Sequence, residues 1–234
     1  MRNIRSLTTK IVLTTAFSIF AVSIPFHTTN AAQGDPTEPA ISTGISILPL
    51  DQHPVPDVLK DQARLEVTQM KSRGYVDADE DLVSYLDKAK ADKDKRLKPM
   101  GEVSPKLKLL PAHLESSLLG QAVLLGAIAS GGHTEEGWTA LSRFFVDPKF
   151  GLVGLEELDY VASQGGMAFI KEAINQDIHG FPAILSVKQS QSKKGLTELI
   201  WATDHKIYTL STNRALKTQK SIDEFLALAR SIPN

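Results

Sequence analysis

The spacing of apolar residues divides this chain into a helical front part and a strand-rich remainder. In residues 56–73 the apolar positions repeat at helical spacing, and Arg73-Gly74 is typical of a helix end. A helix is predicted there. The apolar positions on its inner face are Leu59, Ala63, Val67 and Met70. A second helix is predicted over residues 79–95, with a thin apolar stripe and a charged remainder.

From residue 118 onward the character of the chain changes: a near-continuous apolar run of 13 residues comes first, and turn signals separate the apolar segments that follow. Residues 118–130 fit a buried strand or a buried helix, and we favour a strand. The cluster Asp147-Pro148-Lys149-Phe150-Gly151 favours a turn between two apolar segments. Residues 137–146 and 151–163 are therefore predicted to form an antiparallel hairpin centred on Lys149. One face of this hairpin is expected to be apolar and the other wetter.

The last third of the chain predicts more strands and one closing helix. Residues 167–178 fit a helix or a strand, and we assign them to a strand. Further strands are predicted over residues 183–189, 196–203 and 206–211. Ser221 and Glu224 form a capping-box pattern that predicts a helix beginning at Ser221. The fold class is α+β: N-terminal helices, then a mostly antiparallel sheet of about five to seven strands with a C-terminal helix packed on it.

The first 31 residues have the pattern of a secretory signal peptide. Arg2, Arg5 and Lys10 lead into an apolar run over residues 11–24, and small residues suitable for cleavage follow. A run of about 14 residues is too short to span a bilayer, which needs roughly 17–25. We expect cleavage, a mature start at Ala32 or Gln33, a periplasmic or secreted location, and no membrane span after cleavage.

The expected organisation has four parts. Residues 1–31 are the signal peptide, 32–55 a loose lead-in, 56–111 a helical N-terminal part, and 112–234 the sheet with its C-terminal helix. Without the leader the chain carries 23 basic and 27 acidic residues, a formal charge of −4. A mildly acidic chain without a basic stripe does not favour nucleic-acid binding. The absence of cysteine excludes a disulfide framework and thiol chemistry.

The C-terminal stretch over residues 180–232 resembles bacterial exported domains of the lipoprotein-carrier and anti-sigma-regulator kind. The resemblance is carried by Gly180-Phe181-Pro182-Ala183, Leu199-Ile200-Trp201, Tyr208-Thr209-Leu210 and the closing helix over residues 224–232. It implies a broad antiparallel sheet with helices across one face. It also implies that the protein binds lipid-like ligands or protein partners instead of catalysing a reaction.

Two sets of side chains are candidates for a site. The apolar set consists of Trp138, Phe144, Tyr160 and Trp201. If these side chains line one face of the sheet, they form a candidate surface for an apolar ligand. The polar set consists of Arg143, Glu157 and Asp159, for which we favour a structural cross-strand ion pair.

No metal or cofactor is expected from the sequence. His133 with Glu135 and His113 with Glu115 are the nearest approach to ligand pairs, and no third ligand is marked by spacing. No catalytic residue is assigned.

These patterns favour an exported, non-enzymatic binding or accessory module that engages an apolar ligand or an envelope protein. One alternative is a hydrolase or other enzyme without a recognisable motif. Another is an inhibitor or interaction protein that uses the charged helix near residues 88–98.

Overall fold

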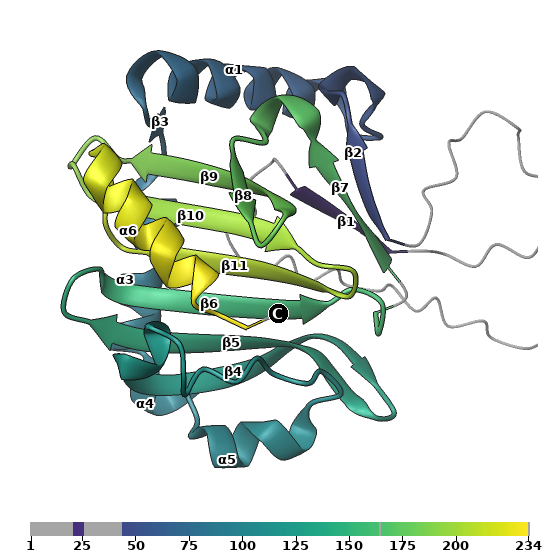
Figure 1. The fold of residues 1–234 in the computed structure, drawn as a ribbon, viewed down its shortest axis with the longest axis vertical. Helices are drawn as coiled ribbons and strands as arrows, with labels where there is room; N and C mark the ends of the chain where they lie inside the picture. Colours follow the sequence, from purple (N-terminus) through teal and green to yellow (C-terminus); the bar gives the residue numbers. More distant parts are fainter. Residues whose placement is uncertain (1–20, 26–43, 164, 234) are drawn as a thin grey trace, which may run out of the picture.

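The structure is a computed structural model that describes residues 21–25, 44–163 and 165–233. It confirms the α+β class. Figure 1 shows a broad sheet with α6 crossing its front and further helices behind and at its two edges. The helices are α1 (Asp57–Arg73), α2 (Glu80–Val83), α3 (Tyr85–Ala91), α4 (Lys93–Arg96), α5 (Met100–Val103) and α6 (Gln219–Arg230). Within these residues no helix is long and apolar enough to cross a membrane.

The main sheet has eight strands in the order β3-β9-β10-β11-β6-β5-β4, with β8 also paired to β9. Its pairs are antiparallel except β3 with β9, so the sheet is mixed and larger than the five to seven strands expected. The strands are β3 (Val76–Asp77), β4 (Val123–Thr134), β5 (Gly137–Asp147), β6 (Gly151–Asp159), β8 (Gln176–Ile178), β9 (Phe181–Gln189), β10 (Gly195–Ala202) and β11 (Lys206–Thr212).

A second sheet of three strands has the order β1-β7-β2. Its strands are β1 (Ala21–Pro25), β2 (Ile45–Leu48) and β7 (Gly165–Ile170). β1 belongs to the predicted signal peptide, whose other residues lie outside the described part, as do residues 32–43 of the lead-in. The lead-in is not loose throughout, because β2 pairs with β7 in parallel.

The predicted helix over residues 56–73 is confirmed as α1. Its C-terminus is set by Gly74, which adopts a φ of 75° and donates its N–H to the carbonyl of Met70. The second predicted helix is wrong as a single element. It breaks at Ser84 (φ −99°, ψ 5°) and Asp92 (φ −94°, ψ 11°), which leave helical geometry and are residues of low helix propensity.

The strand assignments are confirmed with interruptions. Residues 118–130 begin as a short 3-10 turn over Leu119–Gln121 and continue as β4. Residues 167–178 contain β7 and β8, separated by a 3-10 turn over Lys171–Ala173. The hairpin of β5 and β6 has the predicted register, with Val146 opposite Leu152. Its turn is held by Asp147 Oδ1, which accepts from the N–H groups of Lys149 and Phe150, each at 2.8 Å.

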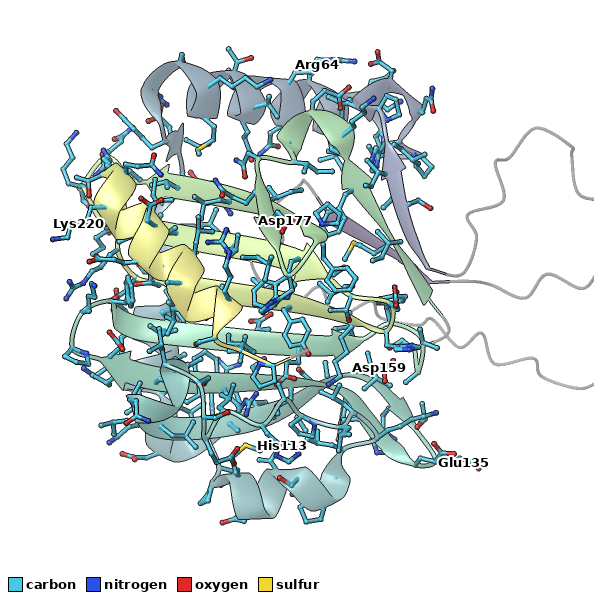
Figure 2. All side chains as sticks on the ribbon, viewed as in Figure 1. Arg64, His113, Glu135, Asp159, Asp177 and Lys220 are labelled. Carbon is cyan, nitrogen blue, oxygen red and sulfur yellow. The ribbon has the colours of Figure 1, made fainter. Side chains whose placement is uncertain are left out.

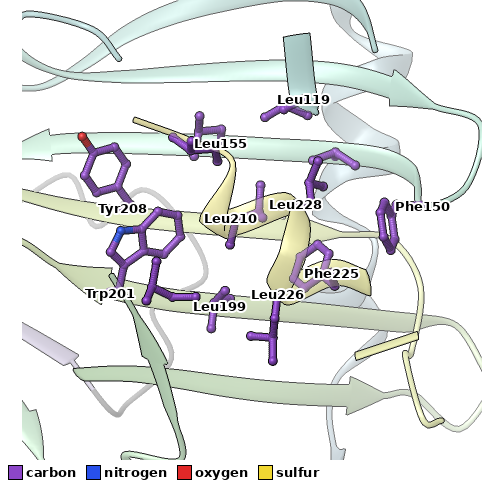
Figure 3. Packing of buried hydrophobic residues seen from close by; sticks show 14 of the residues in the cluster. Leu119, Phe150, Leu155, Leu199, Trp201, Tyr208, Leu210, Phe225, Leu226 and Leu228 are labelled. Carbon is purple, nitrogen blue, oxygen red and sulfur yellow. The ribbon is translucent and has the colours of Figure 1, made fainter. Parts of the chain in front are cut away.

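Both faces of the main sheet are covered. We call the face under α6 the front face and the opposite one the back face. On the front face α6 packs against the strands (Figure 3) through a cluster that includes Leu199, Trp201, Leu210, Phe225 and Leu228. On the back face α1 and the second sheet cover Ile184 and Ile200, whereas α2 and α3 cover Phe144 and Leu152.

The prediction that one face of the hairpin is wetter is therefore wrong. The side of β5 and β6 that carries Arg143 and Glu157 lies in the interior, beneath the connection over residues 107–122 and next to the α6 cluster. The reason lies in the hairpin itself, since β5 is buried on both sides at residues 139–141 and 143–145. A strand that is apolar on both sides needs a covering layer on each.

Candidate functional site

The four apolar candidates are not brought together. Phe144 lies on the back face under α2 and α3, and Tyr160 lies in the separate cluster beneath α1. Trp201 lies on the front face, stacked on Tyr208 with ring centroids 4.9 Å apart. Trp138 packs edge-on against His133 near the end of β5. Because these side chains belong to different clusters and both faces, they do not form one concave apolar surface.

Two of the three polar candidates form the predicted cross-strand ion pair. Arg143 Nη2 lies 2.5 Å from Glu157 Oε1, and both side chains are buried. Asp159 does not join them. Its Oδ1 accepts from the N–H of Ala162 at 2.7 Å and so holds the turn after β6, at the end of the strand where Figure 2 labels it.

The backbone of Ala112 and the ammonium of Lys206 complete this ion pair. The N–H of Ala112 donates to Glu157 Oε2 at 2.8 Å, and its carbonyl accepts from Arg143 Nη1 at 3.0 Å. Lys206 Nζ lies 3.8 Å from Glu157 Oε2 and also donates to the carbonyl of Leu110. Two cations thus share one carboxylate beneath the connection over residues 107–122. Nothing in the sequence marked Ala112, because it acts through its backbone.

Several buried donors near the pair have no hydrogen-bond partner in the described part of the chain. They are Arg143 Nε, Trp201 Nε1 and the hydroxyl of Tyr208. Burial and the charge of Glu157 raise the pKa of Tyr208, so its hydroxyl stays protonated. Buried donors without acceptors are uncommon and call for a physical explanation.

A groove of about 420 Å³ opens beside Arg143. It lies between the front face of β4 and β5 and the connection that carries His113, which Figure 2 labels above α5. Its walls include Leu110, Leu124 and Phe145, and its rim includes Glu115. Leu110 is 73% exposed and Leu124 is 40% exposed. A smaller hollow of about 250 Å³ lies beneath α1.

A second concentration of polar groups lies on the back face, where the strands are otherwise apolar. Lys188 and Glu198 form an ion pair with both side chains buried, and the hydroxyl of Tyr85 hydrogen-bonds Ser211. Glu156 lies in the next cross-strand row. It is half-buried and lies opposite Thr209 on β11 and Ser142 on β5.

Glu156 is the most perturbed carboxyl of this layer. Burial, and then the negative charge of Glu198, raise its pKa to about 7. Among the residues that the structure describes, its carboxylate has no hydrogen-bond or ion-pair partner. Groups perturbed in this way are candidates for functional sites, but also occur in structural networks.

The sequence contained a signal for this layer that our predictions did not use. Polar residues alternate with apolar ones on four neighbouring strands: Ser186 and Lys188 on β9, Glu198 on β10, Thr209 and Ser211 on β11, and Glu156 on β6. Period-2 polar positions on strands that are buried on both sides indicate an internal polar layer. Glu156 and Glu157 are adjacent on β6 and therefore point to opposite faces of the sheet, Glu157 toward Arg143 and Glu156 toward the polar layer.

The remaining candidates are dispersed. No group of three His, Asp or Glu side chains that could hold a metal occurs within residues 44–163 and 165–233. His113 lies 3.9 Å from Glu115 at the exposed rim of the groove. On α3 and α4 the basic side chains Lys90, Lys93, Lys95 and Arg96 are exposed, which leaves the interaction-helix alternative as a prediction.

Comparison of the chain with known protein families, with curated proteins and with solved structures finds no match.

Proposed function

We propose that this protein is an exported, non-enzymatic binding protein that takes a small apolar ligand in the groove beside Arg143. The observation that carries the proposal is the groove itself, a hollow of about 420 Å³ with apolar walls. This volume is within the roughly 300–1,000 Å³ of small-molecule sites. The occupied site would also cover apolar surface on Leu110 and Leu124 that is now exposed to water.

A small ligand suits this site better than a protein partner. A stable protein interface buries about 800 Å² on each side over 20–30 residues. The groove is concave and bounded on one side by the connection that Ala112 fixes to the Arg143–Glu157 pair. A fixed wall and a hollow of this size favour a small ligand, such as a single chain or ring, over a protein surface.

Binding of the neutral fluorescent probe N-phenyl-1-naphthylamine tests the proposal. We expect the mature protein to bind the probe, and Leu124→Asp to weaken binding at least about tenfold, because a side chain that contributes apolar burial becomes a charge in the wall. Leu65→Asp is the matched control, since Leu65 is 56% exposed on α1, away from the groove. Equal effects of the two replacements, or no probe binding by the wild type, would contradict the proposal.

The export part of the proposal has its own test. In its native host the protein is expected outside the cytoplasm with a mature N-terminus at residues 31 to 34, because the leader is too short and too polar to remain as an anchor. N-terminal sequencing and intact mass measure this directly. Uncut protein in the membrane fraction is the opposite result.

A second candidate function rests on Glu156. A carboxyl with a pKa of about 7 can both release and accept a proton near neutral pH, as a general acid or base must. If the protein is an enzyme, Glu156 is the residue to replace first, ahead of Arg143, Glu157 and Asp159. A hydrolytic activity lost in Glu156→Gln would favour this alternative.

A further inference from the structure

We infer that the ligand of the groove is an anionic amphiphile, a single apolar chain ending in an oxyanion such as a carboxylate, and that Arg143 binds the anionic end. This inference rests on the proposed function, because it concerns the same groove. It adds a charge requirement that an apolar binding site alone does not have.

The first argument is the hydrogen-bonding capacity of Arg143. A guanidinium has five N–H donors in a fixed plane. Within the described residues Arg143 donates to Glu157 and to the carbonyl of Ala112, and its Nε–H has no acceptor. The residue is only 6% exposed and lines the groove, so little water reaches its guanidinium. An oxyanion at the base of the groove would accept from the part of the guanidinium that lines it.

The second argument is the local charge. Arg143 and Lys206 together carry two positive charges, and Glu157 supplies one negative charge between them. Lys206 is partly exposed and lies opposite Asp159 on β6, whereas Arg143 is buried, so the positive charge beside the groove that water screens least is that of Arg143. Glu115 lies at the rim, but its side chain is exposed and water screens it. An anion bound beside Arg143 would therefore gain more than a neutral group of the same shape.

The third argument is the arrangement of apolar and cationic groups. The cation lies at the base of the groove, whereas Leu110 and Leu124 lie along its wall and keep part of their apolar surface exposed to water. A ligand with one charged end and one apolar chain matches this order, charge inward and chain along the leucines. Charge-assisted hydrogen bonds from arginine to an oxyanion are about twice as strong as neutral ones.

The test compares three ligands with the same twelve-carbon chain, measured by calorimetric titration of the mature protein below their micelle-forming concentrations. They are dodecanoate, dodecanol and dodecylammonium. We expect dodecanoate to bind at least about tenfold more tightly than dodecanol, and dodecylammonium to bind more weakly than dodecanol. Dodecanol binding as tightly as dodecanoate would overturn the inference while leaving the apolar groove in place. Failure of all three chains and of the naphthylamine probe would overturn both.

A double variant tests whether Arg143 causes the preference for an anionic ligand. Arg143→Met alone leaves the buried carboxylate of Glu157 with only the more distant Lys206 as a cation and is expected to destabilise the protein strongly. Arg143→Met with Glu157→Gln removes both charges and keeps an oxygen for the N–H of Ala112. In this variant the preference for dodecanoate over dodecanol is expected to vanish.

The matched control removes another ion pair from the same side of the molecule. Lys149 Nζ lies 2.7 Å from Glu224 Oε1, between the β5–β6 turn and α6, and this pair does not line the groove. Lys149→Met with Glu224→Gln is expected to keep the tenfold preference. A preference that survives in the Arg143 double variant, with its fold verified by circular dichroism, would show that Arg143 does not bind the anionic end.

Discussion

Replacing Phe225 by alanine is expected to lower the free energy of unfolding by about 3–5 kcal/mol, the usual cost of truncating a buried aromatic side chain. The side chain of Phe225 is fully buried between α6 and the front face (Figure 3), with its ring edge-on to that of Phe150 at 5.4 Å. Its neighbours belong to both the strands and the helix, so the cavity left by alanine can close only if α6 shifts on the sheet and repacks its other contacts.

The matched change lies on the same helix. Thr218→Ala removes the side-chain oxygen that accepts from the N–H of Ser221 at 3.2 Å, which is the N-cap bond of α6. This change is expected to cost only about 1 kcal/mol. Urea denaturation of both variants measures the ratio. A cap variant as unstable as the Phe225 variant would mean that α6 is not held by its apolar face.

The second large effect concerns pH. A Glu156 carboxyl whose pKa is about 7 in the folded protein, against the ordinary 4.5, binds its proton more tightly folded than unfolded. As pH rises from 4.5 to 7 the unfolded chain loses this proton first, so the stability of the protein falls across that window and stays low above it. For a half-buried carboxyl we expect a loss of about 2–3 kcal/mol.

Glu156→Gln is expected to remove this loss. The neutral amide has the size of the carboxyl and does not titrate, so at pH 8 the variant should be more stable than the wild type by about the same 2–3 kcal/mol. The charged and titratable neighbours of Glu156, namely Glu198, Lys188 and Tyr85, are unchanged in this variant. Unfolding midpoints between pH 4.5 and 8 measure the difference.

The control is Glu102→Gln, which removes an exposed carboxylate on α5. Its stability is expected to follow that of the wild type at every pH. A Glu156 variant that loses stability between pH 4.5 and 7 as steeply as the wild type would show that another group is responsible.

Local patterns predicted the elements of this fold well where two signals agreed. The β5–β6 hairpin had a turn cluster at its centre and apolar alternation on both sides, so its register and the Arg143–Glu157 diagonal followed from the spacing. The N-cap of α6 was placed three residues too late, at Ser221 instead of Thr218, because both residues are able to cap a helix. The Ser221 hydroxyl instead donates to the Thr218 carbonyl at 2.8 Å.

The site was less accessible to sequence reasoning because its decisive contacts are not local. Ala112 meets Glu157 through its backbone across 45 positions of sequence, and no side-chain pattern marks such a contact. The separation of Phe144 from Trp201 follows from strand order, since they lie on opposite faces of strands that are not neighbours. The groove beside Arg143 depends on how the connection over residues 107–122 crosses the sheet, which only the tertiary structure shows.

The strand order also bears on how the chain reaches its folded state. The main sheet joins two meanders, β4-β5-β6 and β9-β10-β11, each built from strands that follow one another in the chain. They meet along the pairing of β6 with β11, where Glu156 stands opposite Thr209. Each meander closes short loops, whereas their seam brings together residues about fifty positions apart, and such distant pairings form slowly. The leader of this chain is predicted to direct it out of the cytoplasm. If the β6–β11 pairing forms late, the polypeptide remains unfolded for longer and can cross a membrane before its two meanders pair.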